Sequence, residues 1–451
     1  MVCTLRSTRA TVPTDVWGWV DGDGEVAAVS AYWFAALPSA QELSRVSLDF
    51  GLRRADRLLR ELIVPEMGRV WFVRQLSWPV AALALRDELR GVANVKASSI
   101  AHGLESIGCK LAWTHDADAE RILGKRAFGR DGDVVWGFKE LRDPKHYVRN
   151  THRQAASRAL QTDGGIGLAT GARFDVLELS EIGQQLADAF LDQSVGKGGG
   201  RLRKQLIEWI RGGEIAVSRT LRHALSPLHP TVEERGIVHA RVFGAATPAC
   251  EKRSRARVAI GAAAEMREMT EVAARLREKG HGTQADEVLA AYAFGSMIDR
   301  ARDLAAVLSL KVQETRAGLP RSAIGRDAEF KRTAAALQTA AKSFRSKAEV
   351  AKFSEPKSNA FVHALESADV VATASLVAKS TPEVFSIADD RVMRGPLFRL
   401  VENSESMQDL EAEAAREGDA AESIEPDRTN QTFRLANLHA LVRDLEPKAV
   451  P

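Results

Sequence analysis

Basic residues concentrate in three stretches of the chain, beside residue types that contact nucleic-acid phosphates and base edges. The first stretch, residues 147–158, carries arginines among tyrosine, asparagine, histidine and glutamine. The second, residues 196–204, is rich in glycine, and the third, residues 321–357, is the strongest basic concentration in the chain. The candidate phosphate-binding residues are Arg149, Arg153, Arg158, Lys197, Arg201, Arg203, Lys204, Lys331, Lys342, Arg345 and Lys352. A solvated helix face is the simpler interpretation of the first and third stretches.

The glycine-rich stretch predicts either a flexible hinge or a phosphate contact. Backbone N–H groups of a glycine loop attract anions, and the glycines of 196–200 lead directly into basic residues. The segment is not a P-loop, because Lys197 is followed by glycine where that motif needs the hydroxyl that binds magnesium. Any phosphate contact made here would therefore be independent of sequence.

The third stretch combines an apolar helix face with a basic flank. Its apolar residues recur at alternating spacings of four and three, so they share one buried face of a helix over residues 327–353. These residues are Phe330, Ala334, Leu337, Ala341, Phe344 and Ala348. The basic row beside them consists of Lys331, Lys342, Arg345 and Lys352. Such a row could follow a phosphate backbone, or its aliphatic stems could only cover apolar surface.

No pattern of residues predicts a catalytic or metal site. The ten histidines do not fall in His-Glu-x-x-His or another metal-ligand spacing. Asp143 and Lys145 have the spacing of a metal-dependent nuclease, but Pro144 removes a ladder hydrogen bond where that chemistry needs a central strand. We therefore expect no catalytic residue, no metal and no cofactor, and lean against an enzyme.

Composition restricts the compartment and the kind of partner. The net charge of +3 is too small for nucleic-acid binding through bulk charge alone, so an anionic partner would have to meet a local patch. Three widely spaced cysteines predict no disulfide framework, and no apolar run approaches the roughly 20 residues that span a bilayer. A cytoplasmic protein without a membrane partner is expected. The high arginine and alanine content suggests a bacterial source.

The elements that position these residues predict a mainly α fold with an α+β N-terminal part. Within it, residues 79–138 have the order of a winged-helix-like module: helices beginning near Pro79 and Ser98, a short helix over 119–126, and a hairpin turning at Asp131 and Gly132. Such modules bind DNA or serve only as protein–protein modules. The expected divisions are an N-terminal α+β domain over 1–160, an α-rich segment over 172–250, a helical bundle over 251–400, an acidic linker over 401–431 and an amphipathic helix over 432–451.

Individual helices follow from apolar periodicity. Helices are expected over 181–191, 202–210, 258–279, 283–316, 327–353 and 359–378. Thr283 and Asp286 have the spacing for reciprocal capping.

These features favour a non-catalytic, nucleic-acid-associated protein that binds DNA without sequence preference, or an assembly subunit of a cytoplasmic multi-protein system with protein partners. Two alternatives stay open: an enzyme whose site assembles from sequence-distant residues, and a pure protein-interaction scaffold. DNA binding predicts that the three basic stretches converge on one face, whereas a scaffold would scatter them.

Overall fold

The computed structural model describes residues 48–91, 95–114, 121–131, 137–196, 199–261, 265–315, 317–396 and 432–446. Lys197 and the segment 401–431, predicted to be an acidic linker, lie outside these residues. Helices dominate the described part of the chain and its strands are short, so the prediction of a mainly α fold is confirmed. None of the helices described is both long and apolar enough to cross a membrane.

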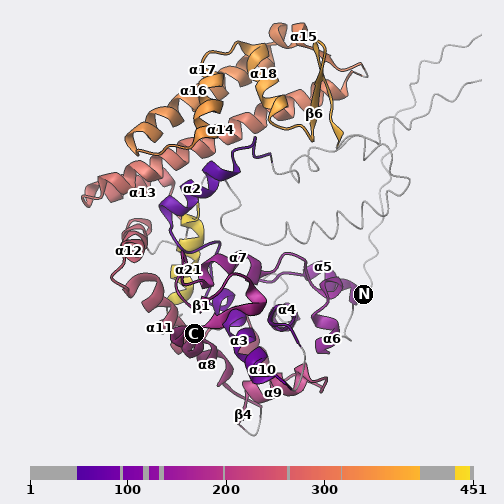
Figure 1. The fold of residues 1–451 in the computed structure, drawn as a ribbon, viewed down its shortest axis with the longest axis vertical. Helices are drawn as coiled ribbons and strands as arrows, with labels where there is room; N and C mark the ends of the chain where they lie inside the picture. Colours follow the sequence, from indigo (N-terminus) through magenta and orange to yellow (C-terminus); the bar gives the residue numbers. More distant parts are fainter. Residues whose placement is uncertain are drawn as a thin grey trace, which may run out of the picture.

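The lower body of the molecule in Figure 1 is built around one buried helix. This helix, α3 (Arg74–Glu88), is buried over residues 74–85 and packs against α4 (Ala97–Trp113), α7 (His152–Leu160) and α8 (Glu181–Leu191). The other elements of the lower body are α5 (Lys125–Asp131), α6 (Phe138–Leu141), η2 (Pro144–His146), β1 (Ala169–Thr170), η3 (Phe174–Val176), β2 (Glu178–Leu179), β3 (Ser194–Val195), β4 (Gly200–Arg201), α9 (Leu202–Ile210), α10 (Arg219–Leu225), α11 (Val232–His239), the π-helical η4 (Ala240–Gly244) and α12 (Pro248–Ile260).

The sequence predicted that this helix begins at Pro79, but α3 begins five residues earlier. Proline is unfavourable inside a helix because it lacks a backbone N–H group, so tertiary packing has overridden this local signal. Leu76 and Trp78 are both fully buried, which draws the preceding turn into the core. The helix start is closed by Gln75, whose Oε1 accepts hydrogen bonds from the backbone N–H groups of Trp71 and Phe72 at 2.7 and 3.3 Å.

The hairpin predicted around Asp131 and Gly132 is not present in residues 125–131, which form α5 instead. Phe128 is fully buried on that helix, and this packing favours a helix over the first strand of the predicted hairpin. Its turn at Gly132 and its second strand fall in residues 132–136, outside the described part of the chain. A two-stranded hairpin does occur further along the chain. Strands β1 and β2 pair antiparallel directly after α7, with Ala169 opposite Leu179.

The upper body in Figure 1 is a helical bundle with one small sheet. The long helix α14 (Gly282–Gln313) packs against α16 (Ala328–Val350) along most of its length. Strands β5 (Leu319–Pro320), β7 (Arg391–Arg394) and β6 (Phe385–Ala388) form an antiparallel sheet in that order. The remaining helices are α13 (Met269–Glu278), α15 (Arg321–Arg326), α17 (Pro356–Glu366) and α18 (Val370–Lys379).

Three helix predictions in this bundle were wrong in detail. The single helix expected over 258–279 is divided between α12 and α13, and Gly261 caps α12 at a φ of +75°. The helix expected over 359–378 is divided between α17 and α18, because Asp369 caps α18 by accepting a 2.7 Å hydrogen bond from the N–H group of Ala372. Thr283 and Asp286 do not cap α14; Asp286 instead pairs with Arg277 at 2.5 Å.

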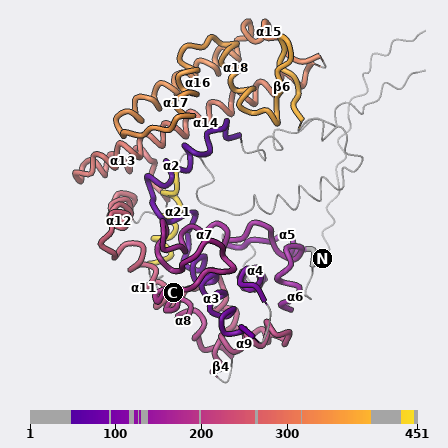
Figure 2. The backbone as a smooth tube through the Cα atoms, viewed as in Figure 1, coloured from indigo at the N-terminus to yellow at the C-terminus, as the bar shows by residue number. Residues whose placement is uncertain are grey.

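Two segments from opposite ends of the chain join the bodies (Figure 2). Helix α2 (Arg53–Ile63) packs on α14, and α21 (Leu435–Leu445) packs on α11 and α12. Phe433, just before α21, lies 6.3 Å from the ring of Phe294 in α14 and 5.2 Å from the guanidinium of Arg60 in α2. The amphipathic helix expected at the C-terminal end of the sequence is therefore a core element.

Candidate nucleic-acid interface

Helix α7 carries the first basic stretch, and its first turn is fully hydrogen-bonded. Thr151 and Gln154 form a capping box, in which each side chain accepts a hydrogen bond from the other residue's backbone N–H group. The N–H groups of His152 and Arg153 donate to the carboxylate of Glu105, at 2.8 and 2.9 Å. These contacts fix the position of α7 against α4, which carries Glu105.

A cluster of buried titratable groups lies beneath this helix. Burial raises the pKa of Glu105 to about 8, against the opposing effects of Arg153 and of the two N–H donors. Burial also lowers the pKa of His102 to about 4 and that of His152 to about 3, so both imidazoles are neutral at pH 7. The Cys109 thiol lies 3.4 Å from the Tyr147 hydroxyl, and burial raises its pKa to about 12. The cluster supports α7 from within.

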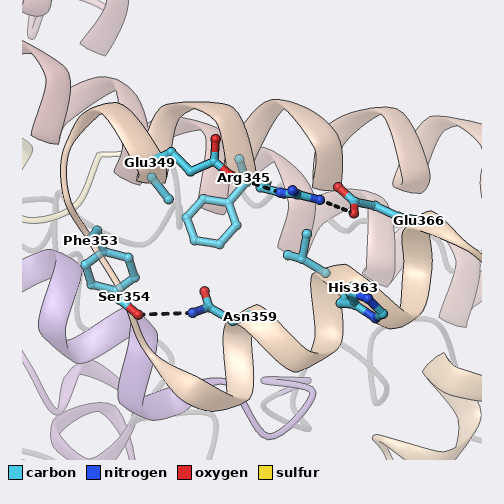
Figure 3. Close-up of a pocket in the computed structure, with 10 residues that line it drawn as sticks. Arg345, Glu349, Phe353, Ser354, Asn359, His363 and Glu366 are labelled. Atoms are coloured by element: carbon cyan, nitrogen blue, oxygen red, sulfur yellow. Dashed lines mark hydrogen bonds and ion pairs between the residues drawn. The ribbon is translucent and has the colours of Figure 1, made fainter.

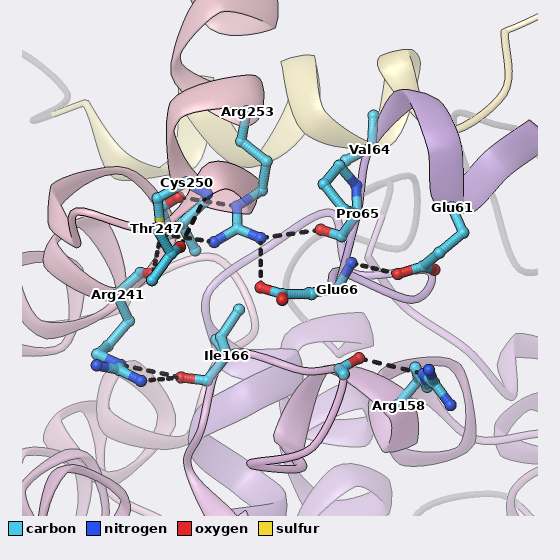
Figure 4. A network of polar contacts seen from close by, with 12 residues as sticks. Glu61, Val64, Pro65, Glu66, Arg158, Ile166, Arg241, Thr247, Cys250 and Arg253 are labelled. Atoms are coloured by element: carbon cyan, nitrogen blue, oxygen red, sulfur yellow. Dashed lines mark hydrogen bonds and ion pairs between the residues drawn. The ribbon is translucent and has the colours of Figure 1, made fainter.

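The outer side of α7 is polar and exposed. Gln154, Ser157 and Arg158 point away from the core, and Arg149 is exposed just before the helix. Arg158 donates from Nε to the carbonyl oxygen of Gly164 at 3.1 Å, as Figure 4 shows. The guanidinium of Arg153 lies 4.7 Å from the ring centroid of Phe174 in η3, so this arginine links α7 to the hairpin loop.

The hairpin that follows α7 is held in place by side chains of α3 and α4. Asp175 in its loop accepts hydrogen bonds from the N–H and hydroxyl groups of Ser98, at 2.7 and 3.0 Å. Arg86 donates to the carbonyl oxygens of Asp175 and Leu177, both at 2.9 Å. Arg173 is exposed in the same loop and is not among the residues predicted from the sequence. Its only signal in the sequence is a single arginine after a glycine turn.

Figure 4 shows a polar network that holds the segment between α7 and β1. Arg241 donates from Nε and from a terminal nitrogen to the carbonyl oxygen of Ile166, at 2.9 and 2.7 Å. The buried Arg253 donates to the carbonyl oxygens of Val242 and Pro65, both at 2.9 Å, and pairs with Glu66 at 3.1 Å. These arginines are structural because their donors are used within the chain.

The second basic stretch is largely neutralised by carboxylates. Arg203 pairs with Asp188 at 2.5 Å, with Asp192 at 3.0 Å and with Glu88. Hydrogen bonds to these carboxylates raise its pKa although burial opposes them. Arg201 lies 3.8 Å from Asp192. Among the predicted phosphate-binding residues of this stretch, Arg201 and Lys204 are exposed. Arg203 joins α9 to α8 and α3 rather than facing a ligand.

The third stretch forms α16, and the predicted apolar face is confirmed. The buried residues of α16 are Phe330, Ala334, Leu337, Ala341, Phe344 and Ala348. Lys331 and Lys342 are exposed on the helix, whereas Lys352 is exposed just beyond its end, at a φ of +53°. Arg345 is also exposed, but it pairs with Glu349 at 3.0 Å and with Glu366 of α17 at 2.6 Å. The row thus contains three lysines and one arginine that is already paired.

The three stretches do not converge on one face. Figures 1 and 2 show α16 in the upper body, α9 near the opposite end of the lower body, and α7 between them. Within the described residues no group of three or more His, Cys, Asp and Glu side chains could hold a metal ion. No protein-family model matches the chain, and neither a curated protein nor a solved structure matches it.

Proposed function

We propose that the chain is a non-catalytic subunit that binds duplex DNA without sequence preference, through α7 and the β1–β2 hairpin. The main support for this proposal is the order of these elements. A capped helix is followed by a two-stranded hairpin that side chains hold in place, as in a winged helix. Arg149 and Arg158 at the helix and Arg173 in the hairpin loop are each exposed. Three guanidinium groups on a helix and a wing suit contacts to neighbouring phosphates.

The other two stretches support this proposal less well. Arg203 and Arg345 are each paired with two or more carboxylates, so phosphate binding would have to displace those ion pairs. Lys331 and Lys342 of α16, and Lys352 just beyond it, carry no such ion pairs in the described residues, and they form a second candidate surface. The separation of the three stretches favours the second candidate, a protein-interaction scaffold.

The deciding experiment is a fluorescence-polarisation titration of a labelled duplex at low salt. The variant combining Arg149→Glu, Arg158→Glu and Arg173→Glu is compared with Lys331→Glu, Lys342→Glu and Lys352→Glu, which changes the net charge equally. We expect the first variant to lose at least about tenfold in affinity and the control to bind like wild type. The log-log salt slope should fall by about 0.9 for each lost phosphate contact.

Three outcomes would contradict this assignment. Loss of binding in the α16 control alone would move the interface to that helix. Equal binding by all three proteins would exclude both surfaces, and absence of binding by wild type would favour the scaffold. Circular dichroism spectra of the variants should match wild type, since all six residues are exposed.

A further inference from the structure

A groove of about 370 Å³ lies on the upper body between the last turns of α16 and helix α17. Figure 3 shows the groove between the two helices, and Figure 1 shows both helices in the upper body, away from α7. Its volume is at the lower end of the range of about 300–1,000 Å³ found for small-molecule sites. The groove is therefore large enough for a compact ring system with a short side chain.

The floor of the groove is apolar. Phe344, Ala348 and Val362 are buried there, and Phe353 is half-buried with its ring centroid 6.3 Å from that of Phe344. A flat or branched apolar body placed here would remove its own apolar surface, and the exposed part of the Phe353 ring, from water.

The rim of the groove carries an excess of negative charge. Arg345 is the one arginine among the lining residues, and it pairs with two carboxylates, those of Glu349 and Glu366. One positive and two negative groups leave a formal charge of −1 at neutral pH. Figure 3 shows Arg345 held between the two glutamates, with His363 beside Glu366.

The opposite side of the groove offers an acceptor. Asn359 donates from Nδ2 to the hydroxyl oxygen of Ser354 at 3.1 Å. This hydrogen bond orients the amide, and in Figure 3 the side-chain oxygen of Asn359 points toward the groove.

We propose that this groove binds a small organic cation, an ammonium or guanidinium group attached to an aromatic body. The body would lie on the Phe344 and Phe353 floor, and the cation would meet Glu366, Glu349 and the Asn359 oxygen. An anion would face two carboxylates, and a neutral ligand would gain nothing from the unbalanced charge. Repulsion by Arg345 opposes the cation, but Arg345 is already neutralised and its side chain is 53% exposed, so water screens it.

The test uses tryptamine as the probe, with tryptophol as its neutral analogue and indole-3-propionate as its anionic analogue. Binding to the full chain is measured by calorimetry or by ligand-observed NMR. Tryptamine should bind about three- to fivefold more tightly than tryptophol, the ratio that a partly exposed ion pair supplies. Indole-3-propionate should bind most weakly.

Two variants locate the site. Glu366→Gln and Glu349→Gln should each bring tryptamine affinity close to that of tryptophol, and Glu349 is exposed enough that its replacement leaves the fold intact. Glu329→Gln is the matched control, because Glu329 is an exposed carboxylate that pairs with Arg332 at the other end of α16. Equal binding of tryptamine and tryptophol, tighter binding of the anion, no binding at about 10 mM tryptamine, or unchanged affinity in both groove variants would each overturn the proposal.

Discussion

The carboxylate of Asp444 accepts a 2.8 Å hydrogen bond from the backbone N–H group of Val73, 371 residues earlier in the chain. Val73 immediately precedes α3, so Asp444 satisfies a donor at the start of the central helix from the last turn of α21. The same carboxylate pairs with Arg121 at 2.6 Å, and its side chain is fully buried. One aspartate thus connects the last turn of α21 to the start of α3.

Replacing Asp444 should therefore destabilise the lower body. We expect Asp444→Ala to lower the free energy of unfolding by about 3 kcal/mol, because it leaves the buried Val73 N–H group without its acceptor and Arg121 without its carboxylate partner. Arg121 would keep only its hydrogen bonds to carbonyl oxygens, such as that of Pro227 at 3.1 Å. Thermal unfolding followed by circular dichroism measures the change. Asp390→Ala is the control, since that aspartate is 75% exposed and should change stability by less than about 0.5 kcal/mol. Equal melting temperatures for the two variants would contradict this role of Asp444.

Two helical glycines should respond in opposite directions to alanine. A Cβ atom on Gly183 of α8 would lie 1.9 Å from the carbonyl oxygen of Leu168, whereas a Cβ atom on Gly236 of α11 would meet nothing within 4 Å. Alanine normally stabilises a helix interior by about 1 kcal/mol relative to glycine. Gly236→Ala should raise the melting temperature, and Gly183→Ala should lower it through the clash. A stabilised Gly183→Ala protein would show that α8 does not approach β1 this closely.

Acid should destabilise the protein through its buried histidines. His102 and His152 have pKa values lowered by burial to about 4 and about 3, so below pH 6.5 the unfolded chain binds protons that the folded chain does not. The contribution of the two neutral histidines to the free energy of unfolding is fully present above pH 6.5 and is lost as the pH falls toward 4. Each histidine contributes a slope of about 1.4 kcal/mol per pH unit between its two pKa values. Glu105, whose pKa burial raises to about 8, contributes a slope of the opposite sign and offsets about one of the two histidines.

A variant isolates this effect. The His152 ring lies 4.8 Å from the ring of Phe72 and 6.1 Å from that of Trp78, so His152→Phe retains an aromatic contact while removing the titration. Urea unfolding from pH 7 to pH 4 should give a shallower decline for this variant than for wild type. Parallel declines would mean that His152 titrates normally in the folded chain.

The apolar face and the basic flank of α16 should differ sharply in their effect on stability. Leu337 is fully buried, and Leu337→Ala should lower the free energy of unfolding by about 2–5 kcal/mol. Lys342 is exposed on the same helix, and Lys342→Ala should change it by less than about 0.5 kcal/mol. Denaturant titrations of the two variants compare them directly, and a large loss for Lys342→Ala would mean that the flank is packed.

Elements with strong local signals could be predicted from the sequence. Helices α8 and α9 have the predicted bounds, 181–191 and 202–210, because each combines apolar periodicity with turn residues on both sides. The buried face of α16 follows from the same periodicity. The start of α3 could not be predicted, because partners distant in the sequence decide it: Asp444 lies 371 residues from Val73.

The candidate site could not be predicted for the same reason, because residues distant in the sequence decide which arginines are available. Whether an arginine is available to a phosphate depends on carboxylates that the fold brings to it, such as Glu88, which lies 115 residues from Arg203. The pairing of Arg345 with Glu366 spans 21 residues and joins two helices. Arg173 was missed because one arginine in a loop is not distinctive until the hairpin places it beside α7.

The docking of α21 also sets an order of events during synthesis. Ribosomes add about 5–20 residues per second, so the 371 residues between Val73 and Asp444 take about 20–75 s to emerge. For that period the nascent lower body has the sequence of α3 but not the helix that closes its core. We expect a nascent chain stalled before residue 432 to remain protease-sensitive around α3, and to become resistant only after α21 has left the exit tunnel.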